Sequence, residues 1–207
     1  MNDGIGRLFV IAAPSGAGKT SLVKALLAGD PNRRFSVSTT TRPKRPMEVD
    51  GVDYHFVSHA DFEAMVAADA FLEYAQVFDN WYGTTRAAVE ALRGAGHDVI
   101  LEIDWQGARQ VRERLPDGIG IFVLPPSRAE LERRLRTRAQ DSDAVIARRL
   151  RDAADDITHW DEFDFVVVND RFDLALAELE AILGGAGEGS RRARPELPGL
   201  VAGLVAR

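Results

Sequence analysis

A glycine-rich segment near the start of the chain has residue types and spacing suited to holding phosphates. It reads Ala13-Pro14-Ser15-Gly16-Ala17-Gly18-Lys19-Thr20, followed by Ser21, and fits the phosphate-loop pattern with alanine in place of the first glycine. The glycines let backbone N–H groups turn inward around phosphate oxygens, Lys19 can reach the outer phosphates, and the Thr20 hydroxyl can bind Mg²⁺. Because an apolar run precedes this segment and a helical pattern follows it, we predict a nucleoside triphosphate site rather than a simple glycine-rich turn.

A second candidate is the run of hydroxyls and cations from Ser38 to Pro46, in a chain whose formal net charge is −6. Between residues 32 and 47 there are five basic residues and no acidic one. Taken alone, such a run is most often a solvated loop. Beside a triphosphate site it has another interpretation, because Arg42 and Arg45 could hold the phosphate of a monophosphate acceptor bidentately.

Glu73 lies in an otherwise mostly apolar, strand-like stretch, residues 71–77, and would share a face with Phe71, Ala75 and Val77. A carboxylate on an apolar face is costly unless it finds hydrogen-bond donors, and a sheet edge open to water would supply them. A guanine base is the alternative source of donors, because its N1–H and exocyclic amino hydrogens form a donor pair that fits one carboxylate. Adenine presents an acceptor at N1, and a site built on such pairing can discriminate by roughly 10⁴–10⁵.

The elements that must position these groups alternate between apolar runs and helical periodicities. Short apolar runs occur at residues 8–11, 99–101, 119–124 and 163–168, and apolar residues at helical spacing follow each of them. This order is typical of βαβ units, and runs without polar alternation indicate strands covered on both faces. We therefore predict an α/β fold with a parallel sheet flanked by helices.

Residues 35–83 break this rhythm. Three short strand-like runs, at 35–37, 54–57 and 71–78, surround one helix that begins with a capping-box-like signal at Ser58. We predict a small β-rich insertion in the parallel core. The segment 184–207 is rich in Gly, Arg and Pro, and we predict a loosely ordered tail that ends in a short apolar segment.

The composition is that of a single globular domain of 207 residues, with 45% hydrophobic and 28% charged residues. The acidic balance argues against general binding to nucleic acid or to a membrane surface. There is no cysteine, which excludes disulfides and Cys-ligated zinc. The sequence has neither a signal-peptide pattern nor an apolar run near the ~20 residues of a membrane span, so we expect a cytoplasmic protein. We also expect a monomer or a small homo-oligomer.

Six segments, in this order, resemble guanylate kinases: SGAGKT, TTRPKRPMEVDGVDYHFV, FLEYAQVFDNWYGTT, LEIDWQGA, FVLPPS and VVVND. The resemblance covers about residues 5–183 and implies the nucleoside monophosphate kinase fold. Its core of five parallel strands would comprise residues 5–34 and 96–183, with a GMP-binding insertion at 35–95 and an arginine-bearing lid at 128–150. The implied reaction transfers the γ-phosphoryl group of ATP to GMP, and to dGMP, with Mg²⁺ as cofactor.

The resemblance also implies roles for single residues, which divide between the two substrates. The GMP phosphate would be bound by Arg42, Arg45, Tyr54 and Tyr82, and guanine by Ser38, Glu73 and Thr84. Glu102 and Asp104, at the end of a strand, would lie near GMP and the metal, while Asn169 would approach adenine. The lid arginines Arg134, Arg138 and Arg149 would bind the ATP phosphates and the transferring group. Since the acceptor is already an oxyanion, catalysis would need cations and alignment rather than a base, with Lys19, Arg42, Arg45 and the lid arginines as the neutralising set.

The sequence departs from the family pattern at four positions. Thr84 replaces serine but keeps the hydroxyl, Glu102 replaces aspartate, and Thr137 and Ala139 replace lid glycines. None of these departures removes a charge.

A catalytically inactive protein-binding module on the same fold is the alternative function from another class, and the intact Lys19 and arginines oppose it. A kinase for another monophosphate is opposed by Glu73. We interpret Arg112, Arg114, Arg133 and Arg136 as solvated helix-face charges.

Overall fold

The computed structural model of the chain describes residues 4–77, 79–138 and 142–206, apart from the side chain of Arg138. The chain divides into two compact units. Unit 1 comprises Met1–Leu8, Asn32–Leu101 and Gln106–Gly118, and unit 2 comprises Phe9–Pro31, Glu102–Trp105 and Ile119–Arg207. Phe78 of the predicted run 71–78 and residues 139–141 of the predicted lid lie outside the described residues.

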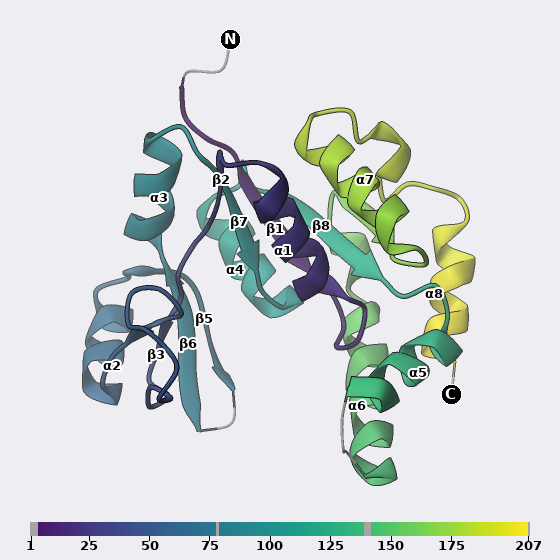
Figure 1. Cartoon of the computed structure of the whole chain (residues 1–207), viewed down its shortest axis with the longest axis horizontal. Helices are drawn as coiled ribbons and strands as arrows, with labels where there is room; N and C mark the ends of the chain where they lie inside the picture. The colour runs from purple at the N-terminus through teal and green to yellow at the C-terminus, as the bar shows by residue number, and fades with distance from the viewer. Residues whose placement is uncertain (1–3, 78, 139–141, 207) are drawn as a thin grey trace. The chain divides into compact units, whose positions relative to one another are not determined.

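A five-stranded parallel sheet has the strand order β2-β7-β1-β8-β9 (Figure 1). Its strands are β1 (Leu8–Ala12), β2 (Arg33–Phe35), β7 (Asp98–Glu102), β8 (Ile119–Leu124) and β9 (Phe165–Val168). Within unit 2, Phe9 pairs with Ile119 and Ile121 with Phe165. Every residue of β1 is buried, because an uninterrupted apolar run suits a strand covered on both faces. The predicted α/β fold with a parallel sheet is confirmed.

Unit 2 contains five helices among the described residues. They are α1 (Lys19–Gly29), α5 (Arg128–Arg138), α6 (Asp143–Ile157), α7 (Phe172–Leu183) and α8 (Leu197–Val205), with 3-10 turns η1 (Trp160–Glu162) and η2 (Glu188–Ser190). Three of them, α1, α5 and α7, each follow a strand of the sheet. Helix α1 packs against α7 and buries Leu22, Val23 and Leu26, the apolar residues at helical spacing. This packing anchors the helix whose N-terminus follows the glycine-rich loop.

Unit 1 contains a smaller, four-stranded sheet with the order β4-β3-β6-β5. Its strands are β3 (Thr39–Thr40), β4 (His55–Phe56), β5 (Phe71–Val77) and β6 (Asn80–Thr85), and its helices are α2 (His59–Ala67), α3 (Arg86–Gly94) and most of α4 (Trp105–Arg114). The predicted helix start is confirmed, since the Ser58 side chain accepts a hydrogen bond from the Asp61 backbone N–H. Phe62 of α2 stacks on Phe71 and Trp81, with ring centroids 4.4 and 5.9 Å away.

The strand predicted at residues 35–37 is displaced in the structure. β2 covers Arg33–Phe35 and pairs in parallel with β7, Arg33 opposite Asp98 and Phe35 opposite Ile100. It therefore belongs to the large sheet, and it tolerates two arginines because it is an edge strand. β3, β6 and α3 were not predicted, since β3 has only two residues and the β6 sequence NWYGTT has no apolar alternation.

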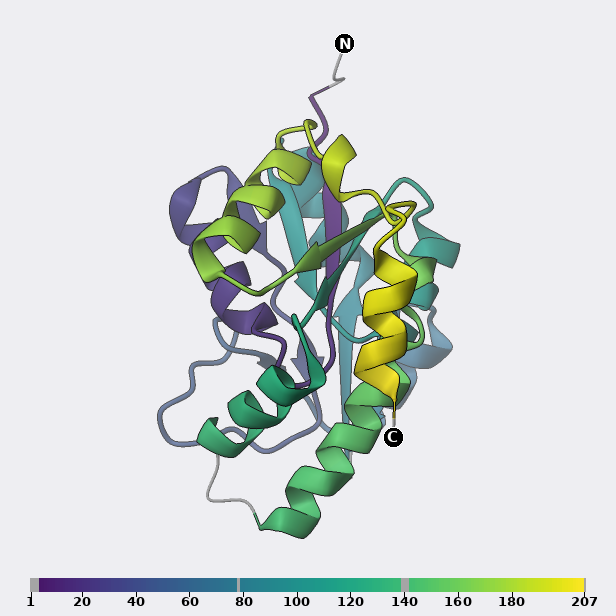
Figure 2. The same cartoon turned by 90° about the vertical axis from the view of Figure 1, so that its right-hand side faces the viewer.

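The segment predicted as a loosely ordered tail makes contacts within unit 2, and the apolar segment predicted at its end forms helix α8. Arg192 N–H donates to Asp164 O at 3.2 Å, and Arg194 Nη2 donates to Val166 O at 2.6 Å, so the segment follows the edge of β9. Helix α8 then packs against α6 and α5, as Figure 2 shows for α6. Its buried residues are Leu197, Val201 and Leu204. The glycines and arginines mask this apolar stripe in the composition. No helix among the described residues is long and apolar enough to span a membrane.

We expect Leu197→Ala to lower the free energy of unfolding by about 2–5 kcal/mol, because Leu197 is fully buried and alanine would leave a cavity. Urea unfolding measures this change. The matched control is Leu174→Ala, whose leucine is 54% exposed and whose loss should cost less than about 1 kcal/mol. Equal effects of the two substitutions would contradict the packing of α8.

Candidate active site

The loop between β1 and α1 requires glycine at two positions. Gly16 and Gly18 have φ values of 93° and 96°, in the left-handed region that favours glycine. An added Cβ would lie 2.9 Å from Leu131 Cδ1 at Gly16 and 2.4 Å from Asn169 Nδ2 at Gly18. Since Gly18 has no side chain to cap α1, the first N–H groups of that helix are left for an anion.

The Lys19 ammonium lies beside the end of β7. Its Nζ donates to Ile103 O at 2.7 Å, and the neighbouring Thr20 hydroxyl donates to Glu102 Oε1. Burial lowers the pKa of Lys19, while the charges of Glu102, Asp104 and Asp156 oppose that shift. The structure therefore brings Glu102 and Asp104, which were predicted to lie near GMP and the metal, close to Lys19 and Thr20. Lys19 was predicted to bind phosphate and Thr20 to bind the metal.

The donor set at this point fits a hard divalent cation. The Thr20 hydroxyl and the Glu102 carboxylate are oxygen ligands, and they already contact each other. Among the described residues, no group of three or more His, Cys, Asp and Glu is placed to hold a metal ion. Mg²⁺ suits such a partial set, because it is usually bound through one or two protein ligands together with substrate phosphates and waters.

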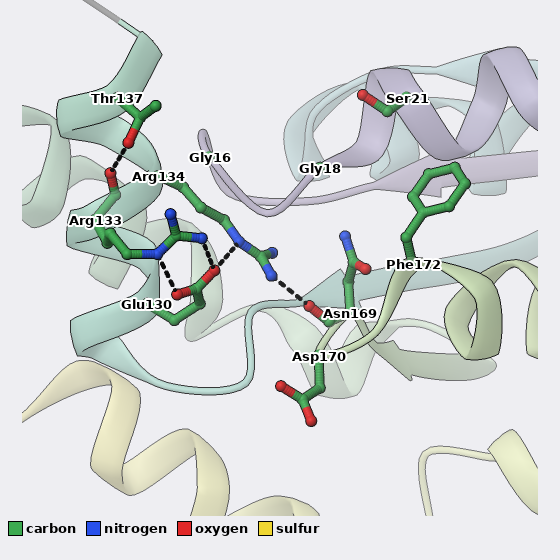
Figure 3. Close-up of a pocket in the computed structure, with 10 residues that line it drawn as sticks. All are labelled: Gly16, Gly18, Ser21, Glu130, Arg133, Arg134, Thr137, Asn169, Asp170 and Phe172. Atoms are coloured by element: carbon green, nitrogen blue, oxygen red, sulfur yellow. Dashed lines mark hydrogen bonds and ion pairs between the residues drawn. The ribbon is translucent and has the colours of Figure 1, made fainter.

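A pocket of about 440 Å³ lies between the glycine-rich loop, α5 and the end of β9. Arg134 extends below the loop toward Asn169, as Figure 3 shows. Its Nη2 donates to Asn169 O at 2.9 Å and its Nη1 to Ala17 O at 3.4 Å. The Asn169 Nδ2 donates to the same Ala17 carbonyl at 2.7 Å. Two predicted ATP residues thus hold one peptide group of the phosphate loop.

Glu130 was missed by the sequence analysis, although it organises this arginine. Its carboxylate accepts from Arg133 Nε and Arg134 Nε, each at 2.7 Å, and these bonds lower the pKa of Glu130 to about 2. Arg133 was expected to be a solvated charge, but it lines the pocket, as do Thr137, Asp170 and Phe172. The only available signal was the spacing of three and four residues between Glu130 and the two arginines.

Of the other two predicted lid arginines, the structure describes the side chain of Arg149 but not that of Arg138. Arg149 Nη2 donates to Ser15 Oγ at 2.9 Å, which joins α6 to the phosphate loop within unit 2. The side chain of Arg138 lies outside the described residues, as does Ala139. Of the predicted lid cations, the structure therefore brings Arg134 and Arg149 to the loop.

In unit 1, the basic run folds around a single carboxylate. Arg42 Nη2 pairs with Glu48 Oε1 at 2.6 Å, and Arg45 N donates to Glu48 Oε2 at 2.8 Å. The hydrogen bond from Arg42 is the largest cause that holds the pKa of Glu48 below its usual value. Glu48 was also missed, because nothing in the sequence distinguishes it from a surface glutamate.

Aromatic rings complete the surroundings of Arg42. Its guanidinium lies 5.5 Å from the centroid of the Tyr54 ring and 5.7 Å from that of Phe56. The Tyr82 ring contacts Tyr54 at 6.0 Å between centroids, and Tyr82 contributes, after Glu48, to raising the pKa of Arg42. The structure thus brings together three of the four predicted phosphate ligands, while the side chain of Arg45 is exposed.

Glu73 and Thr84 lie directly opposite each other in the antiparallel pairing of β5 with β6. Both are buried, Glu73 with 6% and Thr84 with 1% of its surface exposed. Ser38 precedes β3, and its carbonyl accepts a hydrogen bond from His55 N at 2.9 Å. A buried carboxylate beside a buried hydroxyl is an arrangement suited to a ligand that offers several N–H donors.

The chain resembles known proteins over nearly its whole length. The family model for guanylate kinases matches residues 5–186. A guanylate kinase from Methylococcus capsulatus is 56% identical over 200 residues, which cover 97% of this chain and 98% of that protein. One from Alkalilimnicola ehrlichii is 59% identical over 177 residues, covering 86% and 87%. Among solved structures, a guanylate kinase from Anaplasma phagocytophilum has a TM-score of 0.68 at 29% identity, covering 99% of this chain and 98% of that one.

We expect Gly18→Ala to destabilise the protein by about 1–3 kcal/mol, because alanine is strained at this φ and its Cβ would strike the Asn169 amide. Gly203→Ala is the matched control, in a helix where an added Cβ meets nothing within 4 Å. That substitution should stabilise the protein by up to about 1 kcal/mol. Thermal unfolding of both variants tests whether their stabilities change in opposite directions. Stabilisation by Gly18→Ala would contradict the loop geometry.

Proposed function

Because the chain belongs to the guanylate kinase family, we propose an assignment of its residues to the transfer of the γ-phosphoryl group from ATP to GMP. The reaction itself follows from curated relatives that match most of the chain. The chain is an enzyme with ATP and GMP as substrates, and nothing favours an inactive binding module. The observation that carries the assignment is the phosphate loop, with Lys19 and Thr20 beside Glu102.

Unit 2 would hold ATP. The backbone N–H groups of residues 13–21 and the Lys19 ammonium would bind its phosphates, and the pocket beside Asn169 would take adenine. Arg134 and Arg149 already contact the loop, which supports their proposed role at the phosphates. Arg138 belongs to the same set by its place in α5. Closure of these arginines over both substrates would exclude water and limit hydrolysis of ATP.

The Thr20 hydroxyl and Glu102 would hold Mg²⁺ at the phosphate end of ATP. When bound, Mg²⁺ neutralises phosphate oxygens and orients them for the transfer. Before that, the Thr20–Glu102 hydrogen bond keeps both oxygen ligands in one place. Glu102 and Asp104 would lie near both GMP and the metal, and the contacts of Glu102 with Thr20 and the charge of Asp104 near Lys19 support the part at the metal.

Unit 1 would hold GMP. Arg42, Arg45, Tyr54 and Tyr82 would bind its phosphate, and Glu73, Thr84 and Ser38 would bind guanine. Before GMP binds, Glu48 pairs with the Arg42 guanidinium, and a phosphate, which is also an anion, could replace that carboxylate. No assigned contact needs the ribose 2′-hydroxyl, so the proposal includes dGMP. A cytoplasmic location and a monomer or small homo-oligomer remain part of the proposal.

A coupled assay of ADP formation from ATP and Mg²⁺, with GMP, AMP, CMP or UMP as acceptor, tests the assignment of both sites. We expect turnover with GMP alone. Lys19→Met should lower kcat by about 10²–10³-fold, because one preorganised donor to the developing charge is lost. Lys24→Met, on the exposed side of α1, is the control. Unchanged GDP formation by Lys19→Met would remove Lys19 from the catalytic set.

Arg42→Lys should raise KM for GMP by about 10–100-fold, because lysine keeps the charge but lacks the planar fork that binds a phosphate bidentately. KM for ATP should stay within about twofold, since the substitution removes no donor from the phosphate loop. Initial rates at varied GMP and saturating ATP measure the effect. Lys44→Gln, at an exposed neighbouring cation, should change KM for GMP by less than about threefold. Equal effects of the two substitutions would indicate a general electrostatic role for the loop.

A further inference from the structure

The outer edge of β5 is covered by side chains of α4 instead of a further strand. β5 is an edge strand of the four-stranded sheet, so the backbone groups on its outer side need partners. Gln110 Oε1 accepts from Tyr74 N at 3.1 Å, and Gln110 Nε2 donates to Tyr74 O at 3.0 Å. One side-chain amide therefore makes the two hydrogen bonds that a neighbouring strand would make.

Arg114 makes the next contact along the same edge. It lies four residues after Gln110 and therefore on the same face of α4. Its Nη1 donates to Leu72 O at 3.0 Å, and its Nη2 lies 3.4 Å from Asp69 Oδ1. The register of β5 shifts between Phe71 and Glu73, which leaves Leu72 as the extra residue of a bulge. Arg114 was expected to be a solvated charge, but it supplies a partner for the bulge carbonyl.

These contacts hold the two peptide planes on either side of Glu73. The plane before its Cα contains the Leu72 carbonyl, bound by Arg114, and the plane after it contains the Tyr74 N–H, bound by Gln110. Peptide planes are rigid, so φ and ψ of Glu73 are set by the orientations of these two planes. Both angles decide where the Glu73 carboxylate points.

We propose that Gln110 and Arg114 are positioning residues that aim the Glu73 carboxylate at guanine and so set the base specificity of the enzyme. The inference rests on the proposed role of Glu73 in binding guanine. All four contacts lie within unit 1, so they align the carboxylate whether or not a nucleotide is bound. A bulge would otherwise leave this part of the strand free to change its register.

Comparison of GMP with IMP measures this alignment directly. Guanine offers a carboxylate both N1–H and an amino hydrogen, whereas hypoxanthine lacks the amino group. A well-aimed carboxylate gains from the second donor, and a misaligned one does not. The ratio of kcat/KM for GMP to kcat/KM for IMP therefore reports the aim of Glu73. A general loss of folded protein would lower both values and leave the ratio unchanged.

The experiment uses the full-length enzyme with Gln110→Leu and Arg114→Leu. We expect each to lower the GMP/IMP ratio by about tenfold, the effect of one lost hydrogen bond, with KM for ATP within about twofold. Arg114→Lys keeps an N–H donor for Leu72 O and should retain the ratio within about threefold. Glu113→Leu, at an exposed position of the same helix, is the control. Thermal unfolding of each variant shows that it is folded.

Glu73→Gln, measured in parallel, separates this inference from the proposed function. If Glu73→Gln leaves the GMP/IMP ratio unchanged, the proposed role of Glu73 fails and the positioning role fails with it. If Glu73→Gln lowers the ratio while Gln110→Leu and Arg114→Leu do not, the positioning role alone is overturned. An equal fall of kcat/KM for GMP and IMP in the α4 variants would likewise overturn it, because that result indicates structural support only.

Discussion

The cations proposed to bind phosphorylated substrates are influenced by carboxylates, and two of them form ion pairs. Arg42 is paired with Glu48, Arg134 with Glu130, and the Lys19 ammonium is influenced by Glu102, Asp104 and Asp156. A long cationic side chain without a partner would lose rotamer entropy when it binds a phosphate. A carboxylate partner orients the side chain, and an incoming phosphate can replace it because phosphate is also an anion that accepts two parallel hydrogen bonds from a guanidinium.

The second recurring device is a side chain that bonds a backbone group outside regular secondary structure. Ala17 O accepts hydrogen bonds from Asn169 and Arg134, while the Tyr74 N–H donates to the Gln110 side chain and the Tyr74 carbonyl accepts from it. Buried backbone polar groups need partners, and loops or bulges cannot supply them through a ladder. Where the partner is a side chain, the loop conformation depends on a specific residue from another element. This makes the phosphate loop and the bulge of β5 as well defined as the strands beside them.

The sequence predicted those parts whose signal is local. The phosphate loop could be identified because its glycines, lysine and threonine are contiguous and follow an apolar run, and the buried strands could be identified because both of their faces are apolar. β2 was misplaced because its position depends on pairing with β7, and α8 was predicted only as a short apolar segment because its apolar residues are separated by glycines. Glu48 and Gln110 carry no local signal, and Glu130 carries only its spacing of three and four residues from Arg133 and Arg134. Glu48 and Gln110 are ordinary polar residues whose importance comes from partners that the folded chain brings close.

Glu73 differs from these residues, and the difference explains why it could be recognised. A glutamate on a polar loop or helix costs nothing in its surroundings, so its presence raises no question. A glutamate in an apolar strand carries a desolvation cost that some donor must offset. The structure adds that Glu73 is 6% exposed and lies at a bulge whose neighbouring peptide groups are held from α4. A buried carboxylate on a backbone that is fixed from outside cannot move to water to lower this cost. The desolvation cost of this carboxylate must therefore be offset by donors brought to it, and guanine as one source of such donors is the basis of the role proposed for Glu73.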